Sequence, residues 1–288
     1  RKHSREALRR ASKVAGPGPS GSRGAHWAVV LQVPSAFEAL ARVADRIAAA
    51  DLPEEVVDGL APVCLHPLKK KPEGVRPVGA GEALRRVVGR ALLAERNAPL
   101  ADGVGKHQLG AGLRGGGEKL THTVRATAEA RPTDCWVALD LSNAFGTMLR
   151  DGALEAATAV VPDCRAFLGM FLLRDTRYRF VRSTGQAVWM TAGEGAEQGD
   201  VWGPVLYSFA LAPCVAALEE DLRGQLRTAG WDDEAVIEAI GVNAYLDDLV
   251  IRVPPCLAGA VVPAADRALR PMGGRLNQRK CHGRSPET

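Results

Sequence analysis

The 288-residue sequence lacks several features that would assign it to common classes of protein. Its six cysteines are scattered and include no C-x-x-C pair, which argues against a zinc ribbon and against a disulfide scaffold. No apolar run is long enough to cross a bilayer, and no secretory segment stands at the N-terminus. We therefore expect an intracellular protein, in the nucleus or cytoplasm, with no membrane partner and with reduced cysteines, four of them buried in apolar surroundings.

Basic residues are concentrated at the N-terminus, although the net charge is only +4. Residues 1–25 contain seven Lys or Arg and one Glu, whereas the remaining residues contain 30 basic and 32 acidic side chains. Any affinity of the body for nucleic acid would therefore have to come from local patches. Residues 1–25 are also rich in Gly, Pro and Ser, so we expect a linker there, either a basic arm on nucleic acid or a solvated tail.

Three carboxylates lie in or at the ends of short apolar runs that predict buried strands. Asp140 follows Val137-Ala138-Leu139, and Asp247 and Asp248 follow Ala244-Tyr245-Leu246. A buried carboxylate is costly unless it is paired or holds a metal, so these acids predict a cation site. A turn or capping role competes with this interpretation for Asp248, but much less for the other two acids.

The rest of the pattern predicts an α+β protein. Helical spacing of apolar residues covers segments near 35–50, 81–93, 118–130, 150–160 and 204–222, with strand-like segments between them. Two strands flanking Lys69-Lys70-Lys71-Pro72-Glu73-Gly74 predict a hairpin with a basic tip. The segment 174–188 alternates like a strand and carries several basic and aromatic groups, which predict either a nucleic-acid contact or an exposed amphipathic strand.

Six motifs follow one another between residues 62 and 282. They are Pro67-Leu68-Lys69-Lys70-Lys71-Pro72-Glu73-Gly74-x-Arg76-Pro77, Gln108-x-Gly110, Leu139-Asp140-Leu141-Ser142-Asn143-Ala144-Phe145, Gln198-Gly199-Asp200-x-x-Gly203-Pro204, Tyr245-Leu246-Asp247-Asp248 and Gly274-x-Leu276-Asn277-x-x-Lys280-Cys281. In this order they resemble reverse transcriptases, most of all those of non-LTR retrotransposons and group II introns. One departure is Val201-Trp202, where the family usually has Pro-Leu.

The resemblance implies a right-hand polymerase fold with fingers and a palm, in which an antiparallel palm sheet is backed by helices. We expect no thumb within this chain. After the linker at residues 1–25, we expect the fingers at residues 26–134 and the palm at residues 135–288. Within the palm stretch, residues 165–190 are expected to extend toward the fingers.

The implied activity is that of an RNA-directed DNA polymerase, which needs an RNA template, a DNA primer and dNTPs. A primer 3′-hydroxyl attacks the α-phosphate of the dNTP, with two divalent ions activating the hydroxyl and neutralising the leaving charge. Asp140 and Asp247 would bridge two Mg²⁺ ions, with Mn²⁺ as an alternative, while Asp248 supports the site. The backbone carbonyl of Leu141 would add a ligand.

Further residues are assigned to the nucleotide by the same resemblance. Phe145 would exclude a 2′-hydroxyl, whereas an isolated Phe would be a core aromatic. Gln198 and Gly199 would line the pocket, although both also suit a plain helix entry with Asp200 as its cap.

The predicted phosphate and nucleic-acid contacts are basic or aromatic. Lys70 and Arg76 would bind the triphosphate, with a solvated turn as the alternative for the lysine run. Lys280 would protonate the leaving pyrophosphate, or would be an ordinary surface lysine. The expected nucleic-acid contacts are Tyr245, Arg177 and Arg179.

Two other functions stay open. A truncated remnant of a palm could bind nucleic acid without polymerising, or with only weak catalysis. An RNA polymerase has a similar palm, but Phe145 and Leu246 stand where such enzymes usually have an Asp and a Gly.

Overall fold

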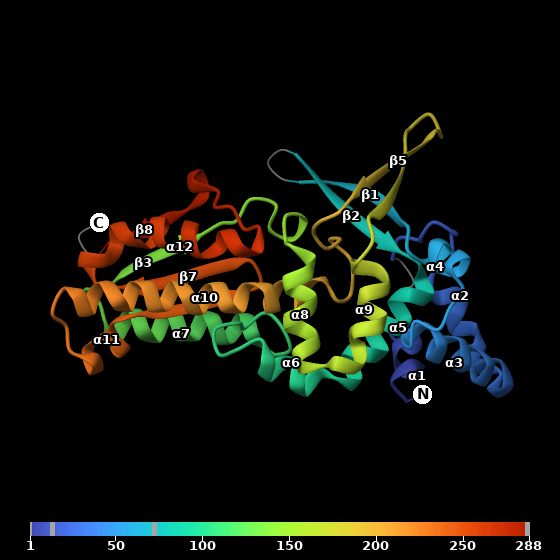
Figure 1. The fold of residues 1–288 in the computed structure, drawn as a ribbon, viewed down its shortest axis with the longest axis horizontal. Helices are drawn as coiled ribbons and strands as arrows, with labels where there is room; N and C mark the ends of the chain where they lie inside the picture. Colours follow the sequence, from blue (N-terminus) through green and yellow to red (C-terminus); the bar gives the residue numbers. More distant parts are fainter. Residues whose placement is uncertain (1, 12–14, 71–73, 286–288) are drawn as a thin grey trace. The chain divides into compact units, whose positions relative to one another are not determined.

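The computed structural model describes residues 2–11, 15–70 and 74–285, which form two compact units (Figure 1). Unit 1 comprises residues 1–99 and 154–203, and unit 2 comprises residues 100–153 and 204–288. Each unit draws on two separate stretches of chain, so the division differs from the expected boundary at residues 134 and 135. Lys71, Pro72 and Glu73, at the predicted basic tip, lie outside the described residues.

Unit 1 contains a four-stranded sheet with the strand order β2-β1-β4-β5. β1 (Val63–Lys69) and β2 (Val75–Gly81) form the predicted hairpin, and β4 (Thr176–Val181) and β5 (Ala187–Ala192) form a second one. The two hairpins are joined by parallel pairing of β1 with β4. This pairing explains why the chain returns to unit 1 after residue 153.

The N-terminal segment is part of unit 1, and the prediction of a linker at residues 1–25 is wrong. α1 (Lys2–Arg9) packs against α5 (Ala83–Glu95), and its Leu8 is only 1% exposed. Farther along, Ser20 donates its backbone N–H and its hydroxyl to the buried carboxylate of Glu82, at 2.6 and 2.7 Å. The composition of residues 1–25 is basic and rich in Gly and Pro, which is typical of a solvated segment. A few apolar side chains and the buried carboxylate of Glu82 are nevertheless enough to hold this segment against unit 1.

Unit 1 also contains further helices. They are α2 (Gly24–Ala28), α3 (Pro34–Ala48), α4 (Glu54–Leu60) and α9 (Arg165–Leu172), while α6 (Asn97–Gly103) and α8 (Arg150–Val160) cross the division between the units. Short 3-10 turns lie at Val29–Gln32 and Pro162–Cys164.

Unit 2 contains a four-stranded sheet with the strand order β6-β7-β3-β8, and all of its pairings are antiparallel. The strands are β3 (Cys135–Leu139), β6 (Gly241–Tyr245), β7 (Asp248–Val253) and β8 (His282–Arg284). An antiparallel sheet in a mixed α+β chain is what the sequence predicted. Leu276 forms a single antiparallel bridge with Leu141.

Unit 2 also contains helices, of which those at residues 116–130 and 203–228 include the segments predicted from apolar spacing. They are α7 (Gly116–Ala130), α10 (Gly203–Thr228), α11 (Asp233–Ala239) and α12 (Val261–Leu269), with 3-10 turns at Ala144–Gly146, Pro255–Ala260, Arg270–Met272 and Gln278–Lys280. α10 buries Leu206, Leu211 and Leu218 almost completely. Within the described ranges, no helix combines the length and the apolar character that a membrane span would require.

Candidate active site

The three predicted acids lie at one end of the unit 2 sheet. Asp140 directly follows β3, and every residue of β3 is paired with β7. Asp248 is the first residue of β7 and pairs with Tyr245, the last residue of β6, so Asp247 lies in the turn between these strands. The antiparallel register thus brings the end of β3 alongside the turn that carries the acid pair.

The carboxylate of Asp140 is partly exposed, at 34%, and already has a cationic neighbour. Nζ of Lys280 lies 3.7 Å from its Oδ2, and the backbone N–H of Asn277 donates to its carbonyl oxygen at 2.8 Å. Asp247 is half-buried and Asp248 is exposed. In the part of the chain that the structure describes, no three Asp, Glu, His or Cys side chains come together as a metal site.

The turn before the acid pair is held by Gln108. Leu246 has φ of 55°, which is rare for a residue with a large side chain. The buried amide of Gln108 accepts from the Leu246 N–H at 2.8 Å and donates to the Leu246 carbonyl at 3.2 Å. Gly110 lies so close that a Cβ there would be 2.6 Å from the Leu246 nitrogen. The resemblance to reverse transcriptases drew attention to Gln108-x-Gly110. The contact of Gln108 with Leu246 was not predicted, because these residues are distant in the chain.

Phe145 lies in a 3-10 turn shortly after Asp140, and its ring stacks on Tyr207 of α10. The ring centroids are 4.7 Å apart and the planes differ by 28°. Tyr207 is fully buried, and its pKa is raised by burial first and by the negative charge of Asp247 second. The stack therefore lies within the electrostatic range of the turn acid. This stack was not predicted, because the sequence placed Tyr207 only within an apolar helix.

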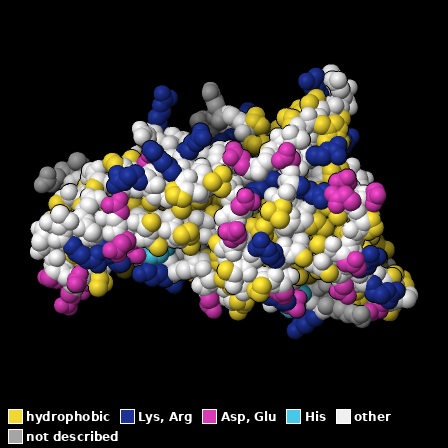
Figure 2. Space-filling view, in the orientation of Figure 1, with side chains coloured by type: hydrophobic (Ala, Val, Ile, Leu, Met, Phe, Trp, Pro, Cys, Tyr) yellow, Lys and Arg dark blue, Asp and Glu magenta, His cyan; other side chains and the backbone are white. Residues whose placement is uncertain are grey.

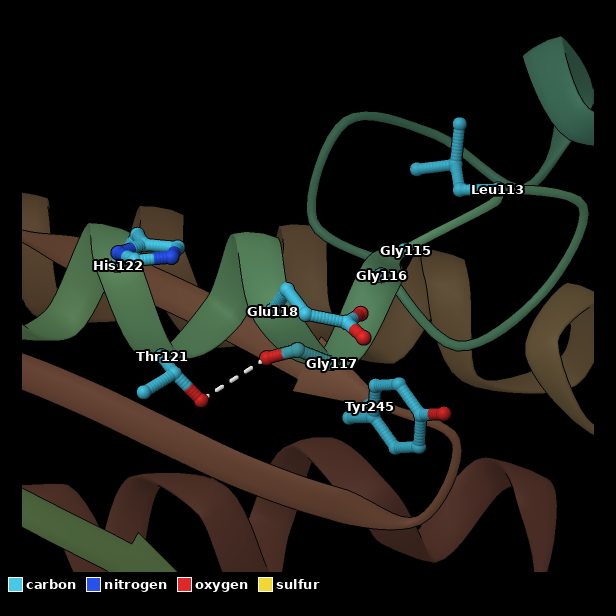
Figure 3. A pocket seen from close by; sticks show the side chains of 8 residues that line it. All are labelled: Leu113, Gly115, Gly116, Gly117, Glu118, Thr121, His122 and Tyr245. Carbon is cyan, nitrogen blue, oxygen red and sulfur yellow. Dashed lines mark hydrogen bonds between the residues drawn. The ribbon is translucent and has the colours of Figure 1, made fainter.

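A pocket of about 590 Å³ opens beside Tyr245 (Figure 3). Figure 3 shows the Tyr245 ring beside the glycine-rich entry of α7, with the side chains of Glu118 and His122 farther along the helix. A Cβ on Gly116 would lie 1.8 Å from the Leu109 carbonyl oxygen, so only glycine fits at position 116. The lining residues are Leu113, Gly115, Gly116, Gly117, Glu118, Thr121, His122 and Tyr245.

The predicted pocket residues Gln198 and Gly199 lie in unit 1, where they are attached to β2. Gly79 donates its N–H to the Gln198 carbonyl at 3.0 Å. Gly199 has φ of 131°, and a Cβ there would lie 2.4 Å from the Gly79 carbonyl oxygen. Glycine is thus required at position 199 because the backbone of β2 passes close to it. The Oε1 atom of Gln198 is buried and has no hydrogen-bond partner among the described residues.

The acids between Gly195 and Gly203 have structural partners. Arg85 of α5 is 2.9 Å from Oδ2 of Asp200 and 3.7 Å from Oε2 of Glu197. The Arg85 side chain is 8% exposed and lies over the ring of Phe171, with 4.1 Å to its centroid. Asp200 also accepts from the Trp202 N–H at 2.7 Å, which fits the capping role considered for it. The arginine partner was not predicted, because it comes from a helix more than a hundred residues away in the chain.

Trp202, the departure from the family pattern, is a core residue of unit 1. It is 1% exposed, and its indole N–H donates to the Gly89 carbonyl at 3.1 Å. Gly89 has no side chain, and a Cβ there would lie 2.7 Å from a methyl group of Val201. Val201 and Trp202 therefore pack into space that a glycine in α5 leaves open.

The predicted phosphate contacts lie on exposed strand ends. Lys70 closes the β1–β2 hairpin by donating its N–H to the Gly74 carbonyl at 3.0 Å, and Arg76 is exposed on β2. Arg177 and Arg179 lie on β4, separate from Tyr245 in unit 2. Leu141 is buried, and its bridge to Leu276 continues the edge of the sheet beyond β3.

Comparison with known proteins gives a likeness of fold. No protein-family model matches the chain, and no curated protein matches it. Among solved structures, the chain is similar to apo telomerase from Candida tropicalis truncated from its C-terminal domain, with a TM-score of 0.55 and 9% sequence identity. The match covers 80% of this chain and 51% of the telomerase chain, so this chain spans about half the length of that structure. The fold is thus a mixed α+β arrangement of the polymerase-like kind.

Proposed function

We propose that this chain is the polymerase part of a retroelement-type reverse transcriptase, which synthesises DNA on an RNA template. The observation that carries the proposal is the position of Asp140 beside the Asp247-Asp248 turn, at one end of an antiparallel sheet. The polymerase-like fold, similar to that of telomerase, supports it. In this hypothesis unit 2 is the palm and unit 1 contributes the fingers, including the β4–β5 hairpin.

The acids suit two Mg²⁺ ions by the chemistry of their donors. Mg²⁺ prefers hard oxygen ligands and is commonly held by one or two carboxylates together with substrate phosphates and water. A cluster of three protein ligands is therefore not needed before substrate binds. The Lys280 ammonium near Asp140 supports the view that this carboxylate attracts a cation. When bound, the ions would lower the cost of the charge that develops as the primer hydroxyl attacks.

In this mechanism Asp140 and Asp247 would hold the ions, Asp248 would support them, and the Leu141 carbonyl would add an oxygen ligand. Lys280 can leave Asp140 and protonate the pyrophosphate, since its side chain is about half exposed. These steps need the lysine to be free to move, and its ion pair with a partly exposed carboxylate is weak enough to allow it.

Phe145 is proposed to form the wall that rejects a 2′-hydroxyl. Its ring is supported on one side by Tyr207 and is itself only partly buried, so it can present a fixed apolar surface to a sugar. Lys70, Arg76, Gln198 and Gly199 would contact the nucleotide from unit 1. For Gln198, the buried oxygen without a described partner supports a ligand contact.

A nucleic-acid-binding remnant without catalysis is the second candidate. It is favoured by the departure of Val201-Trp202 from the family pattern. It differs from the first proposal in predicting template binding with no Mg²⁺-dependent incorporation.

The deciding experiment is single-nucleotide primer extension on an RNA template with Mg²⁺. We expect incorporation by the native chain, none by Asp247→Ala, and normal incorporation by Asp102→Ala, which removes an exposed carboxylate of unit 2. Incorporation that survives Asp247→Ala would refute the assignment of the acids. Template binding without incorporation by any variant would favour the remnant.

A companion measurement addresses the choice of sugar. We expect the native chain to prefer deoxynucleotides, and Phe145→Val to raise ribonucleotide incorporation relative to deoxynucleotide incorporation. A native preference for ribonucleotides would instead indicate an RNA polymerase.

A further inference from the structure

The β4–β5 hairpin of unit 1 exposes an aromatic ring between two arginines. Arg179 of β4 is paired with Trp189 of β5, so their side chains lie on the same face of the sheet, and Arg177 lies two residues away on that face. Trp189 is 48% exposed. The Arg177 guanidinium is 5.0 Å from the centroid of its ring. Val181 and Met190 of the same hairpin are also exposed, at 44% and 43%, so the hairpin carries a group of exposed apolar side chains that suits a partner.

The charge around this face is almost entirely positive. Residues 63–81 and 176–192, which make up the two hairpins, contain seven Lys or Arg and one Glu. Over the β4–β5 hairpin, Figure 2 shows hydrophobic side chains next to Lys and Arg side chains. Among the described residues, neither Arg177 nor Arg179 forms an ion pair. Two arginines without carboxylate partners beside an exposed ring favour a polyanion.

The pairing register extends the face toward the first hairpin. Arg179 is paired with Cys64 of β1, and Arg76 of β2 is paired with Leu68, four residues farther along β1. Side chains alternate along a strand, so Arg76 projects from the same face as Arg179. The basic groups of this face therefore lie on β4 and β2, on either side of β1 in the sheet.

We propose that Arg177, Arg179 and Trp189 form a docking platform for single-stranded nucleic acid, with a base stacked on the tryptophan and phosphates bound by the arginines. Unpaired bases are required because the bases of a duplex are already stacked on each other. Arginine suits the phosphates through its forked donors, and it also stacks on bases. If the proposed polymerase function holds, the strand is the unpaired part of the RNA template. This last identification rests on that function, whereas the platform itself does not.

Binding of a labelled single-stranded oligoribonucleotide to the full chain tests the platform. Trp189→Ala should weaken binding about tenfold, in line with the loss of one base–aromatic stack, and Trp189→Phe should retain most of it. The matched control is Trp231→Ala, because Trp231 is also exposed, at 37%, but lies in unit 2. This control should bind like the native chain. The substituted side chains are exposed, and unchanged thermal unfolding would verify that each variant folds.

Salt dependence tests the arginines separately. Replacing both Arg177 and Arg179 with Ala should reduce the slope of log affinity against log salt by roughly 1.4, since each phosphate contact on a single strand contributes about 0.7. The double Arg→Lys variant should keep the slope. A slope unchanged by the double Ala variant would overturn the phosphate assignment.

Three further outcomes would overturn the proposal. The first is an equal loss of oligonucleotide affinity in Trp189→Ala and Trp231→Ala. The second is that Trp189→Ala weakens the binding of single-stranded and duplex oligonucleotides equally. The third is that Trp189→Ala weakens only the binding of a polyglutamate peptide, which would indicate an acidic protein partner. Asp247→Ala should bind the oligonucleotide normally. A chain that binds through the platform but never incorporates nucleotides would therefore refute the polymerase function and leave the platform intact.

Discussion

Gln108 bonds both backbone polar groups of Leu246 through a single side-chain amide. Leu246 is the residue before Asp247, and its left-handed conformation costs free energy that the surrounding structure must offset. Because Gln108 is buried, its amide has few alternative partners and holds the turn in one geometry. Gln108 is thus a positioning residue for the turn that carries the acid pair.

Gln108→Ala should lower the free energy of unfolding by about 1–3 kcal/mol, because the part-buried backbone groups of Leu246 lose their partner. Urea unfolding would measure this loss. Gln225→Ala is the control, since the Gln225 side chain donates to Asp221 on its own helix and its loss should change stability much less. If the chain incorporates nucleotides, Gln108→Ala should also lower the rate at saturating nucleotide. Unchanged stability would contradict the role assigned to the amide.

Arg85→Ala should be among the most destabilising single substitutions in unit 1. It would leave the nearly buried carboxylates of Glu197 and Asp200 without their cation, and breaking such a buried pair costs about 3–5 kcal/mol. Urea unfolding with tryptophan fluorescence would measure the change.

The control for this substitution is Arg96→Ala. Arg96 pairs with Asp163, whose side chain is about half exposed, and such surface pairs contribute roughly 0–1 kcal/mol. A similar loss of stability in both variants would show that Arg85 does not act through its buried ion pairs.

The sequence predicted those parts of the fold that depend on local periodicity. The hairpin around Lys70, the strand before Asp140, the apolar helix after Gly203 and four buried cysteines all follow from neighbouring residues and are found in the structure. The acid pair was expected in or at the end of a strand, and the structure has it where β6 ends and β7 begins. These features need no knowledge of which distant segments meet.

Features that depend on contacts between distant segments could not be predicted. Leu8 makes α1 a core helix only because α5 offers an apolar surface, and the Arg85 cluster forms only after residues 197–200 fold back on α5. The bond from Gln108 to Leu246 likewise joins residues 138 positions apart. Trp189 was missed because it lies on β5, just beyond the segment 174–188 that was recognised by its arginines. The pairing register that sets its ring beside Arg177 and Arg179 of β4 is not visible in one strand.

Trp202→Ala should destabilise the chain by about 3–5 kcal/mol, the range for removing a large buried aromatic side chain. The indole fills space left by Gly89 and donates to its carbonyl, so truncation would leave both a cavity and an unpaired acceptor. Trp231→Ala should cost far less, because that ring is partly exposed. Equal losses, measured by urea unfolding, would mean that Trp202 is not a packing residue.

Cys164 and Cys214 should be protected from alkylation in the folded chain, whereas the exposed Cys256 should react first. Burial is the main reason that the pKa of each protected thiol is raised from 9.0 to about 11. The thiolate that reacts is therefore scarce, as well as inaccessible. Mass spectrometry of iodoacetamide-treated protein would give the order of labelling, and early labelling of Cys164 would contradict the burial.

The same two thiols predict a dependence of stability on pH. In the unfolded chain they lose their protons near pH 9, but in the folded chain only near pH 11, so the folded state binds more protons in between. The free energy of unfolding should therefore hold its full thiol contribution below pH 9 and fall as the pH rises toward 11. Urea unfolding at several pH values would measure the slope, and a Cys164→Ala variant should show a shallower one. A native slope that is flat or rising across this window would mean that the thiols titrate alike in both states.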